Sequence, residues 1–446
     1  MRPNRTVQTS IFDVFSEHEI GRELKSMSHW LDDRPEVLAL VAADLCRGGV
    51  KQTGREGIPV EAVLRCALLK QYRQLSYEEL AFYVSDSASF RAFARLPVNL
   101  FPKKSVLHKT ISAICAETWE RINLILLHSA KQAKLENGRM LRLDSTVIEA
   151  PIHEPTDNSL LWDSVRVMVR LLRNAGRIDP GIVWHDHSRR ARKRARAIDY
   201  SRGYHNKRQL YRDLIAVSRT TLGYVQAAIV RLSATPPADD EVEAWLAAAR
   251  HYRSLIERII AQAERRVVNG EQVPAGDKLV SLFEPHSAII VKSRREVQYG
   301  HKLNLTAGIS GMILDVVIEA GNPADVERFV PMLRRHIAHY DSAPRQTAAD
   351  GAFASLDNLA KAKALGVKDV AFHKKRGLTI EDMVKSRWVY RKLRNFRAGI
   401  EAGISCLKRA YGLARCTWKG LAHFRAYVWS SVVAYNLALF ARLLSG

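Results

Sequence analysis

Residues 139–148, RMLRLDSTVI, and residues 345–350, RQTAAD, decide the fold of this chain. Both stretches are typical of β-strands, and we place their aspartates, Asp144 and Asp350, at the strand ends. If the two strands lie parallel and side by side, their carboxyl ends meet at one crevice of the sheet. Open α/β sheets bind their ligands at such a place. The two stretches therefore predict an α/β core that carries a pair of carboxylates.

The rest of the sequence divides into three regions by its patterning. The first predicts an all-helical domain that includes a long helix from about Ser105 to Lys134. The second predicts a mainly helical insertion after the first strand. The third predicts a core in which strands alternate with helices. The three regions are residues 1–135, residues 152–280, and residues 136–151 plus 281–446.

The core region contains three more strand-like runs besides the two that open this section. Runs at residues 301–308 and 312–320 are joined by a short glycine-containing turn, which indicates a hairpin. A helix is predicted from Asn322, another lies within residues 353–366, and the last strand-like run covers residues 368–373. With one strand before the insertion, this order predicts a mixed sheet.

A third carboxylate comes from a helix predicted over residues 386–412. Four charged side chains share one arc of about 60° on this helix and border its apolar side. Two glycines inside the helix, Gly399 and Gly403, indicate close approach of another backbone or of DNA. Two aspartates and one glutamate would provide the oxygen ligands that magnesium prefers. The charged residues are Arg394, Arg397, Glu401 and Lys408.

The chain is strongly basic, with 69 Lys and Arg residues against 46 Asp and Glu residues and a net charge of +23. Such an excess favours a polyanionic partner, above all nucleic acid. The densest run, residues 185–209, holds nine basic residues against two aspartates, and we expect it to lie between helices and contact DNA. Its candidate DNA contacts include Arg189, Arg190, Arg192, Lys193, Arg194 and Arg196.

Cysteine spacing and hydropathy indicate a cytoplasmic protein, and the DNA partner expected from its charge would make it nucleoid-associated. The five cysteines form no C-x-x-C pair, which fits a reducing compartment and argues against a zinc ribbon. No secretory signal is apparent at the N-terminus. The most apolar stretch, residues 426–444, contains two serines, an asparagine and an arginine. We therefore expect a buried core helix there and no contact with a membrane.

Residues 394–408, RNFRAGIEAGISCLK, resemble the signature of bacterial insertion-sequence transposases of the DDE class. That signature is Tyr, two residues, Arg, three residues, Glu, six residues, Lys. Arg397, Glu401 and Lys408 match it, whereas Arg394 stands in place of the tyrosine. LRLDSTVI and AADGAF resemble the two aspartate strands of the family. The helical region resembles the domain that precedes the catalytic core in one branch.

The resemblance implies an RNase H-like core in which Asp144, Asp350 and Glu401 are catalytic and hold two Mg²⁺ ions, with Mn²⁺ as a substitute. It implies an endonuclease that binds double-stranded DNA at terminal inverted repeats and hydrolyses the element ends. The freed 3′ hydroxyl would then join target DNA. Arg397 and Lys408, with Arg394, would lie against the DNA, and the active complex would be a homodimer.

Two other interpretations remain open, and both keep the same fold. One is a metal-dependent nuclease or resolvase without strand transfer. The other is a DNA-binding protein that has lost catalysis, against which the intact acids argue. The histidine groups at residues 185–187 and 336–339 offer no third ligand, and we interpret them as a DNA contact and a helix surface. No nucleotide-binding G-x-x-x-x-G-K-[ST] motif occurs, so ATP use lacks support.

Overall fold

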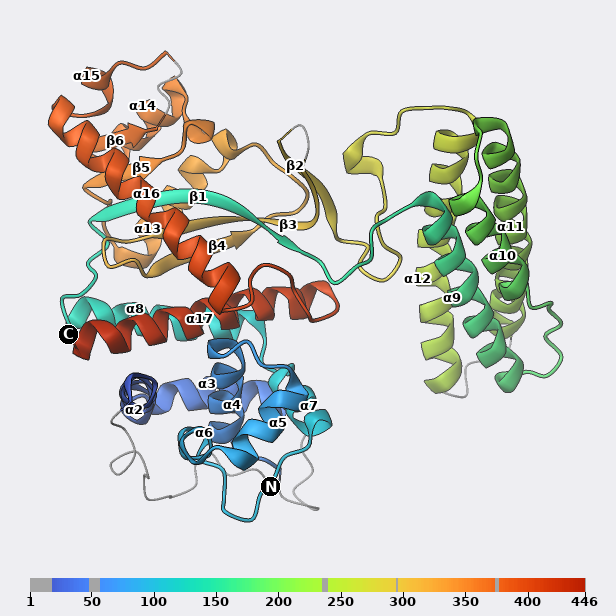
Figure 1. The fold of residues 1–446 in the computed structure, drawn as a ribbon, viewed down its shortest axis with the longest axis horizontal. Helices are drawn as coiled ribbons and strands as arrows, with labels where there is room; N and C mark the ends of the chain where they lie inside the picture. Colours follow the sequence, from blue (N-terminus) through green and yellow to red (C-terminus); the bar gives the residue numbers. More distant parts are fainter. Residues whose placement is uncertain (1–17, 48–56, 235–239, 294–295, 374–376, 446) are drawn as a thin grey trace. The chain divides into compact units, whose positions relative to one another are not determined.

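The computed structural model describes five segments of the chain and divides into two compact units (Figure 1). The first unit joins the N-terminal third to the C-terminal third, and the second is the middle of the chain. The described segments are residues 18–47, 57–234, 240–293, 296–373 and 377–445. The first unit comprises Met1–Glu149 and His301–Gly446, and the second comprises Ala150–Gly300.

A mixed sheet forms the centre of the first unit. Its strands follow the order β4-β3-β1-β5-β6, and β2 pairs with the first half of β3. β3 and β4 form the predicted antiparallel hairpin, whereas β1, β5 and β6 are parallel. All five predicted strands are confirmed, and the order is that of an RNase H-like core. The strands are β1 (Met140–Glu149), β2 (Ala288–Ser293), β3 (Glu296–Ala307), β4 (Ile313–Ile318), β5 (Gln346–Ala349) and β6 (Asp369–Phe372).

The register of β1 against β5 brings the two aspartates together. The last paired residues are Leu143 and Ala349, so Asp144 and Asp350 are the next residues along neighbouring parallel strands. β5 ends there, but β1 continues to Glu149, so the prediction that Asp144 ends its strand is wrong. The predicted side-by-side pairing is confirmed.

Helix α16 (Arg387–Ala410) crosses the parallel part of the sheet (Figure 1). It begins at Ser386, whose hydroxyl accepts the Val389 N–H at 3.3 Å. Its buried residues lie on one side and pack toward β1, β5 and β6. The apolar periodicity of the sequence therefore fixes which side of α16 is exposed.

The remaining helices of the core are α13 (Phe329–Tyr340), α14 (Leu356–Ala364) and α15 (Ile380–Met383). The prediction that a helix starts at Asn322 is wrong, because a 3-10 turn, Asp325–Glu327, precedes α13. Side chains from other elements donate hydrogen bonds to backbone carbonyls of this stretch. Lys302 donates to the Pro323 carbonyl at 2.7 Å, and Asn358 donates to the Val326 carbonyl at 2.7 Å.

The predicted helical region before β1 is confirmed for its described residues, with one change. The predicted helix from Ser105 to Lys134 is two helices, α7 (Lys104–Ile111) and α8 (Ala116–Gln132). The break follows from tertiary structure, since the Cys115 N–H donates to Asp44 Oδ2 at 2.9 Å. The preceding helices are α2 (Glu19–Asp32), α3 (Pro35–Cys46), α4 (Val60–Tyr72), α5 (Tyr77–Asp86) and α6 (Ala88–Ala94).

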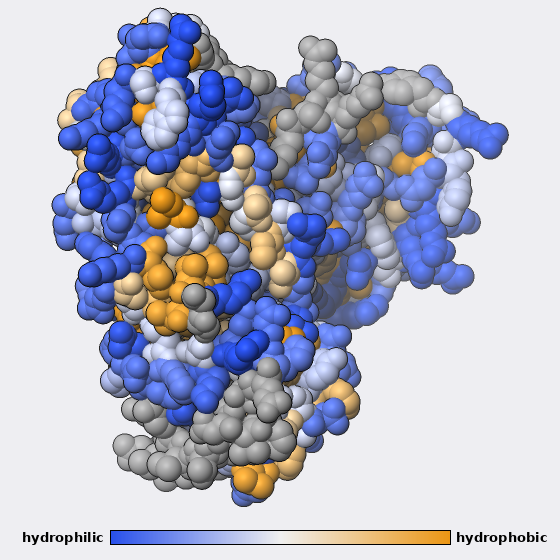
Figure 2. Space-filling view, turned by 60° about the vertical axis from the view of Figure 1, so that its left-hand side comes forward, coloured by the Kyte–Doolittle hydropathy of each residue, from blue (hydrophilic) through white to orange (hydrophobic). Residues whose placement is uncertain are grey.

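Helix α17 (Leu421–Ser445) is the apolar C-terminal helix, and it packs against α8, α4 and α2. Residues Leu421–Leu444 are long and apolar enough to span a membrane, but 78% of the most apolar window is buried inside the protein. The predicted core helix is therefore confirmed. The face in Figure 2 is mainly hydrophilic, with apolar side chains gathered at mid-height in the left-hand part of the view.

In its described residues, the second unit contains a bundle of four α-helices with its own apolar core, and β2 and the start of β3 also fall within its bounds. The prediction that the basic run lies between helices is wrong, because most of it forms a helix itself, α10. Ala191, Ala195 and Ile198 are buried on one side of α10, so its basic residues project from the rest of its circumference. The helices are α9 (Asp157–Ile178), α10 (Ser188–Tyr200), α11 (Tyr204–Ser233) and α12 (Asp240–Ala263).

Candidate active site

Three carboxylates from three separate elements meet at the guanidinium of Arg397. Its Nη2 lies 3.1 Å from Asp144 Oδ2 and 3.8 Å from Asp350 Oδ1. Its Nη1 lies 2.7 Å from Glu401 Oε1, one helical turn further along α16. The structure therefore brings together all three predicted acids and one predicted arginine. We call these four residues the carboxylate cluster.

Arg142, two residues before Asp144 on β1, holds α16 in place beside this cluster. Its Nη1 donates to the Phe396 carbonyl at 2.9 Å, and its guanidinium carbon lies 4.8 Å from the centre of the Phe396 ring. A β-carbon at Gly399 would overlap Arg142 Nη1. The close approach predicted at Gly399 thus exists, but a side chain of the sheet makes it.

Exposure rises from Asp144 to Glu401 across the cluster. The Asp144 side chain is 15% exposed, that of Asp350 is 37% exposed and that of Glu401 is 60% exposed. Burial raises the pKa of Asp144, and the nearby Arg397 charge and the Ser145 N–H oppose that rise. The charge of Arg397 therefore compensates ionised Asp144 only in part.

The cluster has a deficit of positive charge. Three carboxylates share one guanidinium, and the Arg397 Nε is buried without a hydrogen-bond partner among the described residues. Oxygen ligands with a surplus of negative charge suit hard divalent cations. In the described segments, no three Asp, Glu, His or Cys side chains already form a metal-binding group, and here Arg397 stands between the acids. The ligand chemistry fits a divalent cation if Arg397 moves aside.

The other predicted DNA contacts lie outside the cluster. Arg394 is exposed on α16, and Lys408 lies seven residues beyond Glu401, where it lines a separate cavity. The basic residues of α10 belong to the second unit. There Arg190 lies 2.7 Å from Asp213, which also pairs with Arg194. The exposed basic residues of α10 without an ion pair in the described segments are Arg189, Arg192, Lys193 and Arg196.

The sequence does not single out two features beside the cluster. Arg142 is one of them. A lone arginine on the buried side of a strand is nevertheless a pattern from which sequence analysis could have predicted a structural contact. The other is a chain of contacts that supports β1 next to Asp144. Ser145 donates to Asp325 Oδ2 at 3.3 Å, and Lys302 Nζ lies 2.6 Å from Asp325 Oδ1. Its members are far apart in sequence, so spacing alone cannot reveal it.

The two histidine groups have structural surroundings. His187 Nδ1 lies 3.2 Å from the Thr221 hydroxyl, and its ring stacks on Tyr224. The interpretation of His336 as a helix-surface residue is wrong, because it is 1% exposed and its Nε2 lies 2.9 Å from the Gly138 carbonyl. Burial lowers the pKa of His336 to about 4, so it is neutral at physiological pH.

Comparison with known protein families gives two matches. A family model described as a transposase DDE domain matches residues 292–437, and a second model, described as a transposase domain, matches residues 13–113. The chain belongs to the DDE transposases of insertion sequences. Searches of curated proteins and of solved structures found no match.

The matched ranges contain two of the three acids of the carboxylate cluster. The DDE range contains Asp350, Arg397 and Glu401, whereas Asp144 lies in neither range. The structure relates Asp144 to the matched DDE range, because the β1–β5 register places Asp144 beside Asp350. The chain is thus a DNA-transposing enzyme by family, and DDE transposases generally use divalent metal ions.

Proposed function

We propose that this transposase binds the terminal inverted repeats of its element and hydrolyses the phosphodiester bond at each element end. The freed 3′ hydroxyl is then joined to target DNA. One observation carries the proposal: Asp144, Asp350 and Glu401 meet around a single arginine. Side chains that are distant in sequence and share a deficit of positive charge indicate a site that binds cations.

In the proposed reaction, Asp144, Asp350 and Glu401 hold two Mg²⁺ ions, which Mn²⁺ can replace. When bound, such ions activate the attacking oxygen and stabilise the leaving oxygen of a phosphodiester. Arg397 holds the carboxylates together in the free enzyme, since its two terminal nitrogens contact all three. A phosphate offers a guanidinium the same paired acceptors as a carboxylate. Arg397 therefore binds the DNA phosphate when it leaves the acids.

DNA binding is assigned to the basic parts of the chain. Residues 1–135 form the DNA-binding domain, residues 136–151 plus 281–446 form the catalytic core, and residues 152–280 form a basic insertion. The net charge of +23 and the exposed basic residues of α10 support the assignment of DNA binding to basic parts of the chain. Arg394 and Lys408 extend the contact surface along α16. Because two element ends are processed together, the active complex is a homodimer, and it works in the cytoplasm on the nucleoid.

The decisive experiment compares Asp144→Asn, Asp350→Asn and Glu401→Gln with the wild type. The substrates are duplexes that carry the inverted repeats flanking the gene, and nicking and binding are measured on the same preparations. Each substitution should lower Mg²⁺-dependent nicking by at least about 10³-fold, because it removes a metal ligand. Binding to the ends should remain within about twofold, since phosphate contacts elsewhere supply the affinity.

Asp357→Asn is the matched control, because Asp357 is 67% exposed and its one ion pair among the described residues is with Lys361 on α14. It should leave nicking unchanged. Retained nicking in any one of the three variants removes that acid from the proposed site. Loss of binding together with thermal stability would instead assign the acids to holding the fold. Nicking without joining to target DNA would favour the nuclease or resolvase interpretation.

A further inference from the structure

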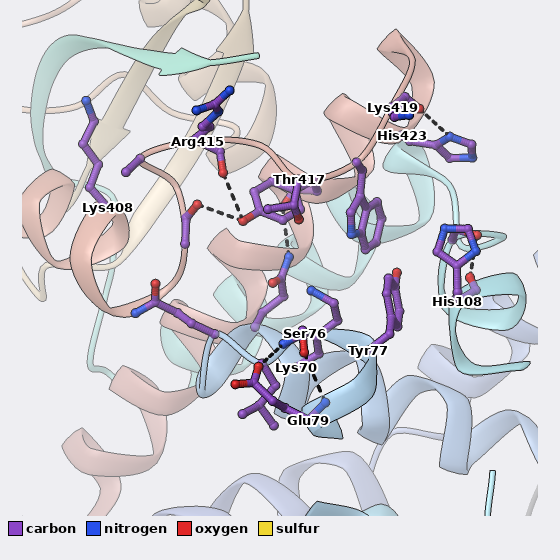
Figure 3. A pocket seen from close by; sticks show the side chains of 18 residues that line it. Lys70, Ser76, Tyr77, Glu79, His108, Lys408, Arg415, Thr417, Lys419 and His423 are labelled. Carbon is purple, nitrogen blue, oxygen red and sulfur yellow. Dashed lines mark hydrogen bonds between the residues drawn. The ribbon is translucent and has the colours of Figure 1, made fainter. Parts of the chain in front are cut away.

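Two lysines are buried among the described residues, and their surroundings differ. Lys70 lines a cavity of about 900 Å³, where its Nζ lies 5.0 Å from the centre of the Tyr77 ring (Figure 3). Lys302, on β3, is 7% exposed, and its ammonium contacts one short segment at two points. It lies 2.6 Å from Asp325 Oδ1 and donates to the Pro323 carbonyl at 2.7 Å. A buried charge thus holds the 3-10 turn that precedes α13.

This 3-10 turn, Asp325–Glu327, is joined to β1 immediately beside Asp144. The Ser145 hydroxyl donates to Asp325 Oδ2 at 3.3 Å, and the Ser145 N–H donates to Asp144 Oδ1 at 2.8 Å. In the described part of the chain, the contacts of the Asp325 carboxylate go to Ser145 and Lys302. Asp325 therefore lies next to the carboxylate cluster without belonging to it, and it influences Asp144 through β1.

The same turn is joined to the segment that follows Asp350. The side-chain amide of Asn358, on α14, donates to the Val326 carbonyl at 2.7 Å and to the Phe353 carbonyl at 2.9 Å. Phe353 ends a second 3-10 turn, and its N–H donates to the Asp350 carbonyl at 3.1 Å. Asn358 is 5% exposed, so these bonds lie inside the protein. One turn therefore connects the surroundings of both aspartates.

These contacts begin where the pairing of the two strands ends. The β1–β5 ladder stops one residue before each aspartate, so it fixes the strands only up to the acids. Beyond that point, side chains from β1, β3 and α14 connect the strand ends through the turn. Desolvation offsets much of the attraction in a buried ion pair, so such a pair is weak evidence for stability. We call the four connecting residues the bracket: Ser145, Lys302, Asp325 and Asn358.

We infer that the bracket sets the separation of the Asp144 and Asp350 carboxylates, and that Asp325 is a positioning residue for the binding of divalent metal. The inference rests on the proposed two-metal site and adds residues that hold no metal themselves. Metal ligands depend on hydrogen-bonded partners for their orientation, and loss of such a partner commonly lowers metal affinity by about 10–100-fold. Two ions only about 4 Å apart make the site sensitive to the spacing of its acids.

The test measures Mn²⁺ binding by the full chain without DNA, from the electron paramagnetic resonance signal of the free ion. Binding to the acids is the part that Asp144→Asn abolishes. Asp325→Ala removes the acceptor of the Ser145 hydroxyl and should weaken this part by about tenfold. Asp325→Asn keeps an oxygen at the same place, so it should retain most of the affinity.

Two further variants separate position from folding and from charge. Ser145→Ala leaves the ion pair of Lys302 with Asp325 intact, so it should weaken Mn²⁺ binding with little change in the midpoint of thermal unfolding. It decides the question if Asp325→Ala does not fold. Glu327→Gln is the matched control, because it removes an exposed carboxylate from the same turn, and it should leave the Mn²⁺ affinity unchanged.

The Mg²⁺ dependence of nicking gives a second measurement. Half-maximal nicking by Asp325→Ala should need about tenfold more Mg²⁺, while binding to the inverted repeats stays unchanged. Unchanged Mn²⁺ affinity in folded Asp325→Ala or in Ser145→Ala overturns the inference and assigns the bracket to the fold alone. Equal losses in Asp325→Ala and Asp325→Asn also overturn it, because the charge of Asp325 would then attract the metal. Failure of the proposed function would appear separately, as a wild type that binds no more Mn²⁺ than Asp144→Asn, and the inference would fall with it.

Discussion

The carboxylate cluster and helix α10 use charge in opposite ways. In the cluster, one arginine is shared by three acids, and its side chain is only 13% exposed. On α10, exposed basic side chains follow one another along the helix, and a single aspartate, Asp213, neutralises two of them. The first arrangement depends on where each charge lies. The second depends on how many charges there are.

This difference teaches which substitutions should be severe. A partly buried charge acts over a few ångströms, so a small displacement changes the reaction strongly. Exposed charges act on phosphate through their sum, and salt screens each of them. We therefore expect single substitutions near the cluster to be severe and those on α10 to be graded.

The largest expected effect outside the acids is at Arg142, which touches neither DNA nor metal in the proposed function. Arg142→Met removes the hydrogen bond to the Phe396 carbonyl and lets α16 shift against β1. Because a misplacement of about 1 Å can cost about 10²-fold in rate, nicking should fall by that order while end binding persists. Single-turnover nicking and anisotropy on one preparation would measure both.

A double-mutant cycle with Gly399 separates this positioning role from general loss of stability. Gly399→Ala should also slow nicking, because its β-carbon would overlap Arg142 Nη1. In the Arg142→Met background, the same glycine substitution should add little, since the overlapping group is gone. Fully additive losses would mean that Arg142 does not set the position of α16, and the contrast with α10 would weaken.

The next effect is graded and belongs to α10. The fourfold variant replaces Arg189, Arg192, Lys193 and Arg196 by alanine. The plot of log affinity against log salt should become less steep, by about 0.9 for each phosphate that the helix no longer binds. Arg190→Ala with Arg194→Ala is the matched control, because Asp213 already neutralises part of their charge. Salt titrations from low to physiological ionic strength would measure the slopes. An unchanged slope in the fourfold variant removes α10 from the DNA interface.

The sequence predicts those parts of the molecule that depend on local patterns. Alternation and helical spacing find five of the six described strands, all but β2, and the helix that carries Glu401. The order of the strands implies the pairing of Asp144 with Asp350. The break at Cys115 depends on a hydrogen bond to Asp44, and the support of Asp144 depends on Lys302 and Asp325. Contacts between distant residues carry no periodicity, so they become visible only in the folded chain.

Lys70 offers the smallest effect and the sharpest test of whether a single buried charge acts by position. Burial lowers the pKa of its ammonium to about 8, from an ordinary value of 10.5. Below pH 8 both the folded and unfolded chains carry the proton, so the fold bears the full cost of burying the charge. As pH rises from 8 to 10.5, the folded chain loses the proton first and the cost disappears. The shift corresponds to at most about 3 kcal/mol, and the contacts with the Tyr77 and Trp418 rings offset about 1–2 kcal/mol of it.

Lys70→Met should therefore raise the midpoint of thermal unfolding by a few degrees at pH 7, and the gain should shrink at pH 9.5. Lys392→Met, which removes an exposed lysine, should show no such pH dependence. Destabilisation by Lys70→Met at pH 7 would mean that the lysine holds the two rings in place as a structural contact. Stabilisation at pH 7 that shrinks at pH 9.5 would mean that the fold bears the cost of burying this charge.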